Sequence, residues 1–261
     1  MIGTFSIEFL NLPREIIVAT MQDHQRYFPV ANQDGSLHNK FVFIANNTNK
    51  EKHHIVEGNE KVLRPRLEDA KFFYEEDIKT SIDFRLNELK SITYHKNLGT
   101  IYEKAKRIEK STDSLCKYFK ASKKITSEVA MLAYNDLTSR TVSEFPSLQG
   151  KMSAEFAAIN KHQPEIIDAL STFYHPRFHD DDLPSSREGL CASYAEKLDT
   201  IVGIFALGIK PSGDKDPFGL RRSSTGLIRI LVEGEVDIDL LKTINMALAN
   251  FDVKVNAEEL V

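Results

Sequence analysis

Residues 191–205, CASYAEKLDTIVGIF, carry apolar side chains at the spacing of an α-helix with 3.6 residues per turn. The side chains on this apolar face are Cys191, Tyr194, Ala195, Leu198, Val202 and Phe205. Asp199 falls on the same face, because it follows Ala195 by four positions. The stretch therefore predicts a helix that faces the core and takes a carboxylate into it.

Helical spacing continues on both sides of this stretch, from about residue 80 toward the C-terminus. We expect helices over 101–119, over a segment with Thr126 and Ser127 as candidate caps, over 163–174, after Asp216-Pro217 and over 238–250. A loop rich in Asp and Pro, HPRFHDDDLPSS, precedes the helix at 191–205. The pattern predicts a mainly α-helical domain over residues 81–261.

Residues 1–80 have a different pattern, in which short β-type runs mix with helical ones. Residues 5–10 alternate like a strand, and Pro13 stands where a helix can begin. Residues 26–32 and 40–46 flank a turn cluster and predict a β-hairpin. A helix is expected over 55–78, with a kink or restart at Pro65. The fold class is therefore α+β, with a small mixed α/β region at 1–80 followed by the helical domain.

Composition limits the kind of protein. The chain has 261 residues, 41% hydrophobic and 28% charged, with a net charge of −4, so it is globular and has no overall basic field. The two cysteines, Cys116 and Cys191, are too few and too far apart for a disulfide framework. No run approaches the roughly 18 apolar residues of a membrane span. We expect a cytoplasmic protein without membrane contact.

Two acidic residues lie on predicted apolar faces. Asp136 follows Val129 by seven positions and Ala133 by three, and Asp199 has the position described above. An unpaired buried carboxylate costs several kcal/mol, so each needs a metal, a cation or several hydrogen-bond donors. A metal site and a structural carboxylate both fit the spacing. We predict that both acids are structural, and that loss of either destabilises the fold by about 1 to 3 kcal/mol.

The order His95, Asn135-Asp136 and Asp199 is similar to that of the His-Asp (HD) metallophosphohydrolase superfamily. In that superfamily the central doublet is His-Asp and both residues bind metal. Asn135 stands here in the place of the histidine, and an amide is a far weaker ligand than imidazole. The resemblance implies a degenerate HD-like domain without bound metal or catalytic residues. A metal-dependent phosphohydrolase acting on nucleotides or RNA ends is the alternative function.

Three further histidines, His162, His175 and His179, flank a loop and are interpreted as surface groups. The sequence also contains no glycine-rich phosphate loop, nucleophile elbow or thiolate zinc signature. No active site is therefore predicted within this chain.

Cations and aromatic residues mix in RPRLEDAKFFY, residues 64–74. Arg64, Arg66 and Lys71 are candidate contacts to RNA, since single-stranded RNA is held by phosphate contacts and stacking. An amphipathic helix with ion pairs between successive turns explains the same spacing, and spacing alone favours it.

A second basic stretch, KDPFGLRR at residues 215–222, places cations near the start of a predicted helix. The helix dipole disfavours positive charge there, so Lys215, Arg221 and Arg222 call for an anionic partner. Arg229 follows Arg222 by seven positions on the same face. We predict that these four residues contact RNA phosphates, helped by first-turn amides, unless one of Arg221 and Arg222 turns inward to a core carboxylate.

Several ordered blocks together resemble the glycyl-tRNA synthetase β subunit family. They are MQDHQRYFPV at 21–30, GNEKVLRPR at 58–66, DAKFFY at 69–74, EFPSLQG at 144–150, KLDTIVG at 197–203 and DPFGLRR at 216–222. The resemblance spans almost the whole chain and implies a central fragment, with the end of an editing-type module followed by an HD-like domain.

The same resemblance implies a division of labour between two subunits. In that family the catalytic α subunit forms the glycyl-adenylate and holds ATP with Mg²⁺, whereas the β subunit mainly grips tRNA(Gly). The expected partners of this chain are therefore the α subunit and tRNA(Gly). No cofactor is expected in the chain itself, and the anticodon-binding part is expected beyond Val261.

Overall fold

A computed structural model describes residues 1–46, 52–213 and 215–251. The chain divides into two compact units, which are treated separately. The N-terminal unit comprises residues 1–80 and 139–149, and the helical unit comprises 81–138 and 150–261. The chain leaves the N-terminal unit after Thr80, where the sequence pattern changes, and returns to it for residues 139–149. The predicted division at residue 80 did not include this return.

The N-terminal unit contains a three-stranded antiparallel sheet in the order β1 (Ile2–Thr4), β3 (Leu37–Val42), β2 (Phe28–Ala31). Strands β2 and β3 form the predicted hairpin. The predicted strand at 5–10 is wrong: Ile7–Asn11 forms the 3-10 helix η1. The apolar residues at alternate positions do not share one face, as they would in a strand. Phe9 is buried, but Ile7, two positions earlier, is 72% exposed.

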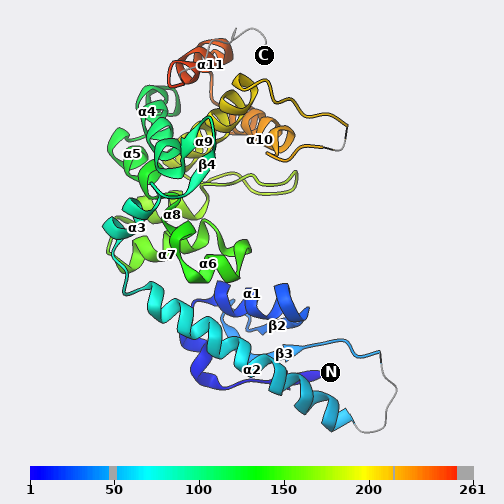
Figure 1. The fold of residues 1–261 in the computed structure, drawn as a ribbon. Helices are drawn as coiled ribbons and strands as arrows, with labels where there is room; N and C mark the ends of the chain where they lie inside the picture. The colour runs from blue at the N-terminus through cyan, green and yellow to red at the C-terminus, as the bar shows by residue number, and fades with distance from the viewer. Residues whose placement is uncertain (47–51, 214, 252–261) are drawn as a thin grey trace. The chain divides into compact units, whose positions relative to one another are not determined.

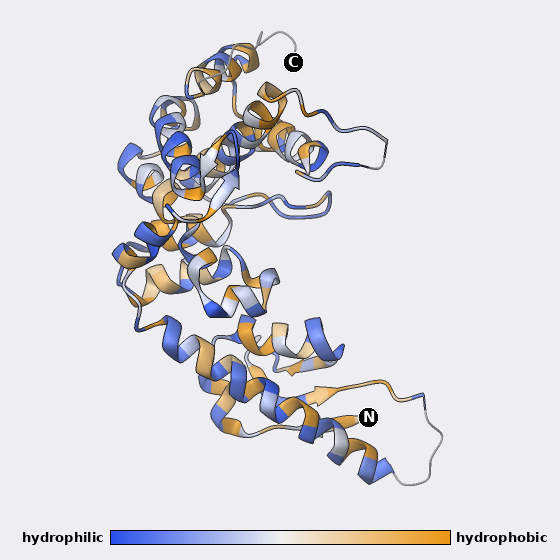
Figure 2. Cartoon of the chain, in the orientation of Figure 1, coloured by the Kyte–Doolittle hydropathy of each residue, from blue (hydrophilic) through white to orange (hydrophobic). Residues whose placement is uncertain are grey.

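The N-terminal unit also contains two long helices (Figure 1). Helix α1 (Arg14–Gln25) begins directly after Pro13, as predicted. Helix α2 (Lys52–Asp77) continues through Pro65 without a restart. Its hydrophobic and hydrophilic residues alternate around the helix (Figure 2), and Leu63 and Leu67 are buried. The α2 helix therefore has one face in the core of this unit and another in solvent.

The returning segment 139–149 holds helix α6 (Arg140–Glu144) and the 3-10 helix η3 (Pro146–Leu148). The buried carboxylate of Asp77, at the end of α2, accepts hydrogen bonds from the amides of Arg140 (3.0 Å) and Thr141 (2.9 Å). It also accepts one from the Thr141 hydroxyl (2.7 Å). Asp77 thus joins the returning segment to α2 by satisfying amides that a helix start leaves unpaired.

The helical unit is built around α9 (Arg187–Ala206), which contains the sequence quoted at the outset. Cys191, Tyr194, Ala195 and Val202 of α9 are fully buried, as predicted, whereas Phe205 is half-buried. Helices α4, α5, α8, α10 and α11 pack against α9. The elements of this unit are α3 (Ile82–Glu88), β4 (Thr93–His95), β5 (Gly99–Thr100), α4 (Ile101–Phe119), α5 (Lys123–Leu132), η2 (Asn135–Thr138), α7 (Lys151–Ile159), α8 (Pro164–Ser171), α9, α10 (Leu220–Glu233) and α11 (Leu240–Leu248).

Local side-chain bonds set where these helices begin. Helix α4 starts with a capping box between Thr100 and Glu103, after Gly99 at φ +81°. Helix α5 starts at Ser122 and not at the predicted Thr126, whose hydroxyl donates to the Ser122 carbonyl from within the helix. None of the described helices has the length and apolar character needed to cross a membrane.

Candidate nucleic-acid interface

Asp199 lies on α9 at 2% exposure and is held by two cations from α4. Lys104 Nζ is 3.0 Å from its Oδ2, and Arg107 Nε is 2.8 Å from its Oδ1. Lys104 also donates to the Thr200 hydroxyl (2.7 Å) and lies 3.6 Å from Glu196. Burial opposes the charged ammonium, but the nearby carboxylates outweigh it and raise the pKa of Lys104. The expectation that a cation holds Asp199 is confirmed.

Asp136 is fully buried in η2 and is held by amides at the start of α7. Its Oδ2 accepts from the Gly150 amide (2.6 Å) and the Ser153 amide (3.2 Å). Burial raises the pKa of Asp136 to about 6, although these bonds favour the carboxylate. Asp136 is therefore held by helix-end amides, the second kind of structural partner that was predicted.

The remaining residues of the HD-like order also have protein partners. Asn135 donates from Nδ2 to the Leu132 carbonyl (2.8 Å), and the half-buried His95 accepts at Nδ1 from the Asn97 amide (3.2 Å). The buried Asn135 Oδ1 and Tyr134 hydroxyl have no hydrogen-bond partner in the structure. Across the described residues, no group of three or more His, Cys, Asp or Glu side chains is placed to hold a metal ion.

The three basic candidates on α2 are all paired with acids of the N-terminal unit. The pairs are Arg64–Glu68 at 3.5 Å, Arg66–Glu144 at 3.7 Å and Lys71–Glu8 at 3.5 Å. Arg64–Glu68 is a pair between successive turns, as the alternative that spacing favoured requires, whereas the two other pairs join α2 to α6 and η1. Such exposed pairs contribute about 0–1 kcal/mol each and leave the cations accessible, so their contact with tRNA stays a prediction.

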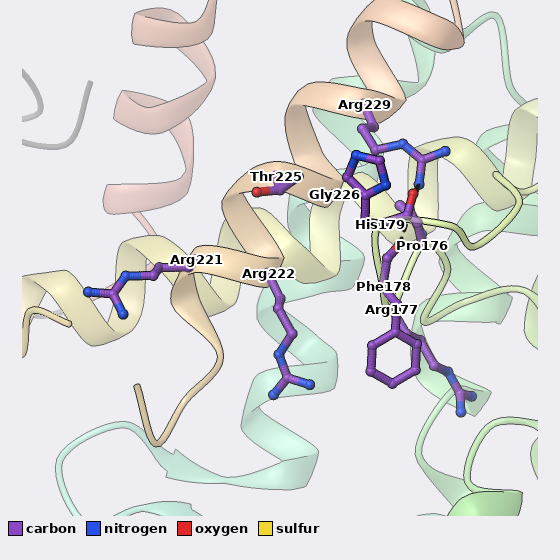
Figure 3. A pocket seen from close by; sticks show the side chains of 9 residues that line it. All are labelled: Pro176, Arg177, Phe178, His179, Arg221, Arg222, Thr225, Gly226 and Arg229. Carbon is purple, nitrogen blue, oxygen red and sulfur yellow. Dashed lines mark hydrogen bonds between the residues drawn. The ribbon is translucent and has the colours of Figure 1, made fainter. Parts of the chain in front are cut away.

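Arg221, Arg222 and Arg229 of α10 line one pocket of about 220 Å³ together with the loop before α9, although the Arg221 side chain points away from the others (Figure 3). Among the described residues, its lining includes four arginines and one histidine and no carboxylate. The lining residues are Pro176, Arg177, Phe178, His179, Arg221, Arg222, Thr225, Gly226 and Arg229. Lys215 does not line this pocket. A pocket with this lining favours an anionic group such as a phosphate.

Arg229 fastens the loop to α10. Its Nη1 donates to the carbonyls of His179 (2.9 Å) and Asp181 (3.0 Å). Its Nε and Nη2 donate to the Glu233 carboxylate at 2.6 and 2.9 Å. Because these bonds use both sides of the guanidinium, Arg229 shapes the pocket and is less suited to hold a ligand than was predicted.

The start of α10 differs from the prediction. The Asp216 carboxylate accepts from the amides of Leu220 (2.8 Å) and Arg221 (2.9 Å), so these first-turn amides are occupied and cannot bind a phosphate. Arg221 Nη1 donates to the Gly213 carbonyl at 2.6 Å. The alternative in which one arginine reaches a core carboxylate is also wrong for Asp199, because Lys104 and Arg107 hold it from α4.

Arg222 is exposed, and its guanidinium extends to the same side of the pocket as that of Arg177 (Figure 3). Next to Gly226 of the pocket lining, the buried Lys197 donates to the Tyr174 carbonyl and the Ser193 hydroxyl, both at 3.1 Å. Burial lowers the pKa of Lys197 to about 8. Gly226 leaves room for this side chain, because a Cβ there would lie 2.7 Å from Lys197 Cε.

Arg177 and Phe178 were not predicted to be site residues, and His179 was interpreted only as a surface group. Their one signal was the tripeptide RFH, which mixes cations with an aromatic ring in a loop. The loop lies more than 40 positions before α10 in the sequence, and only the fold joins the two. The site therefore needed the structure to be recognised.

The fold and the pocket define an α+β protein whose helical unit carries an arginine-lined pocket. The chain belongs to the glycyl-tRNA synthetase beta subunit family, whose model matches residues 1–261. It is thus related to subunits of an aminoacyl-tRNA synthetase, which confirms the resemblance read from the ordered blocks.

Three relatives, each named glycine--tRNA ligase beta subunit, illustrate the match. That of Coxiella burnetii (strain Dugway 5J108-111) is 39% identical over 254 residues, covering 97% of this chain and 37% of the relative. That of Colwellia psychrerythraea is 41% identical with the same coverage. That of Psychromonas ingrahamii is 39% identical over 261 residues, covering 100% of this chain and 38% of the relative. The chain therefore spans a little over a third of the length of these relatives.

Proposed function

We propose that this chain is part of the β subunit of a two-subunit glycyl-tRNA synthetase and supports the binding of tRNA(Gly). One observation carries the proposal: the α10 pocket gathers four arginines and a histidine without a carboxylate in its described lining. The overall charge of the chain is −4, so this local clustering is not a by-product of a basic protein. Arginine side chains recognise phosphate through paired N–H donors, which suits an RNA backbone.

The proposal assigns the chemistry of aminoacylation elsewhere. The partner is the catalytic α subunit, which binds ATP and Mg²⁺ and attaches glycine to the tRNA. The helical unit is then a degenerate HD-like scaffold, in which Asp136 and Asp199 stabilise the fold. The alternative, a metal-dependent phosphohydrolase, has no specific observation in its favour, because Lys104 and Arg107 already neutralise Asp199.

The test compares Arg222→Ala with Lys124→Ala in the full-length protein assembled with its α subunit. Each variant removes one exposed positive charge from the helical unit, but Lys124 lies on α5 and does not line the pocket. Arg222→Ala should weaken binding of tRNA(Gly) by roughly 3- to 10-fold, as expected for loss of one charged hydrogen-bonding group at a partly exposed site.

The dependence of affinity on salt gives a second readout. Loss of one phosphate contact should lower the slope of log affinity against log salt by about 1 in Arg222→Ala and leave it unchanged in Lys124→Ala. Equal affinities and slopes for the two variants would show that the pocket does not contact tRNA.

A further inference from the structure

We infer that the α10 pocket holds an unpaired nucleotide of the bound RNA, with its base stacked on Phe178 and its phosphate held by Arg222 and Arg177. This inference rests on the proposed tRNA binding and specifies which part of an RNA the pocket accepts. The ring of Phe178 lies between the guanidinium groups of Arg222 and Arg177 in the view of Figure 3. All three residues line the same pocket.

Phe178 is 61% exposed, although an aromatic ring normally gains by burial. The loop that carries it is nevertheless fastened at several points. The Arg177 amide donates to the Asp181 carboxylate (2.6 Å), Arg229 binds two loop carbonyls, and the Ser193 hydroxyl donates to the His175 carbonyl. The ring is therefore presented on a preorganised loop, which lowers the entropy lost when a flat partner stacks on it.

The chemistry of the lining favours a nucleotide over a simple anion. A free phosphate would use the arginines and leave the exposed ring of Phe178 in water. The base of a nucleotide has a π-face that stacks on an aromatic ring, and the phosphate of the same nucleotide lies only a short distance from the base. Both features of the pocket, the cations and the aromatic ring, are then used by one ligand.

The size of the pocket and the form of RNA limit the ligand further. Its volume of about 220 Å³ is below the roughly 300–1,000 Å³ of pockets that enclose small molecules, so it suits one base or phosphate of a longer chain. In a double helix the base faces are covered by their neighbours. An unpaired nucleotide, in a loop, a bulge or a single-stranded end, is the part of an RNA that exposes a face.

Acids contact several of the residues that line the pocket, and three of these acids are engaged within the protein. Asp181 accepts from the Arg177 amide, Glu233 is paired with Arg229, and Asp216 accepts from the Leu220 and Arg221 amides. Asp180 is almost fully exposed, with its carboxylate 2.9 Å from His179, and would repel a bound phosphate. Its high exposure means that water and salt screen this repulsion.

The experiment measures binding of the full-length protein, assembled with its α subunit, to two RNA hairpins with the same stem. One hairpin ends in an unpaired 3′ tail and the other is blunt. Phe178→Leu removes the stacking surface and keeps an apolar side chain, and Phe178→Tyr keeps the ring. Phe84→Leu removes another exposed aromatic ring of the helical unit, 56% exposed on α3, as the matched control.

Phe178→Leu should weaken binding of the tailed hairpin by about 5- to 150-fold, the range for loss of one stacked base. Binding of the blunt hairpin and the slope of affinity against salt should stay unchanged. Phe178→Tyr should restore the affinity, and Phe84→Leu should have no effect. Far-UV circular dichroism at increasing temperature checks that each variant is folded.

Two results would overturn the inference. If Phe178→Leu binds the tailed hairpin as tightly as the unchanged protein, or loses affinity for both hairpins equally, no unpaired base stacks on Phe178. In either case, a loss of tRNA affinity in Arg222→Ala would leave the proposed function intact. If Arg222→Ala also binds tRNA(Gly) normally, the proposed function fails together with this inference.

Discussion

Asp199→Asn tests whether the ion cluster between α4 and α9 stabilises the helical unit. The amide keeps the shape of the carboxylate but removes the negative charge that faces Lys104 and Arg107 at 3.0 and 2.8 Å. Lys104 then remains at 2% exposure and keeps the Thr200 hydroxyl, the more distant Glu196 and the Tyr94 ring as partners, none of which replaces the lost carboxylate. Removing one member of a buried ion pair costs about 3 to 5 kcal/mol, because the other charge stays buried.

This magnitude exceeds the 1 to 3 kcal/mol that the sequence alone suggested, since the partners are two charged groups and not neutral donors. Hydrogen exchange of peptides from α4 and α9, followed by mass spectrometry, reports the free energy of opening in this unit alone. Exchange from both helices should accelerate in Asp199→Asn by at least about 100-fold if opening costs 3 kcal/mol less.

Two further variants separate lost charge from lost packing. Glu196→Gln should cost under about 1 kcal/mol, because Glu196 is farther from Lys104 and partly exposed. The triple variant Lys104→Met, Arg107→Met and Asp199→Leu should recover much of the loss, since apolar residues of similar size leave no charge of this cluster buried. Exchange in Asp199→Asn within threefold of the unchanged chain would refute the reasoning, as would a triple variant no more stable than Asp199→Asn.

Three more outcomes are expected, each measured by urea unfolding followed by circular dichroism. The pKa of Asp136 is about 6 in the folded state against 3.8 for the free side chain, so the folded state binds the Asp136 proton more tightly than the unfolded state. The contribution of Asp136 to the unfolding free energy should therefore be greatest below pH 4 and fall by roughly 3 kcal/mol as pH rises through 6. Asp136→Asn should abolish that part of the pH dependence, and an unchanged profile would contradict it. Gly99→Ala should cost about 1 to 3 kcal/mol, because the residue has φ +81° and a Cβ would lie 2.0 Å from the Glu103 carboxylate of the capping box; a neutral effect would mean that the box is not needed. Asp216→Ala should cost about 0.5 to 2 kcal/mol through loss of its bonds to the first turn of α10, without weakening tRNA binding, whereas reduced tRNA affinity would assign Asp216 a role in the pocket.

Periodicity predicted the helices of this chain well, and local bonds explain where it failed. A face of apolar residues marks the interior of α9 or α4, but the first residue of a helix depends on which side chain accepts the free amides. Ser122 does so for α5, although Thr126 is an equally good candidate by residue type. A six-residue alternation is also too short to separate a strand from the 3-10 helix found at Ile7–Asn11.

The candidate site was predictable only for the part that lies on one element. Arg221, Arg222 and Arg229 follow one another on α10, so their grouping can be read from spacing. Phe178 reaches them through the fold, because Arg229 binds its loop over about 50 positions. Likewise, the burial of Asp199 was visible in the sequence, but its partner Lys104 is 95 positions away. Partners across such distances leave no periodic signal.

The return of residues 139–149 to the N-terminal unit affects the order in which the chain can fold during synthesis. Residues 1–80 leave the ribosome before residues 139–149, because the amides that cap onto Asp77 lie roughly 60 residues further along the chain. At about 5–20 residues per second, α2 and its sheet wait roughly 3 to 12 s for that segment. During this interval the first part of the helical unit is already emerging. The N-terminal unit can therefore be completed only after part of the helical unit has been synthesised.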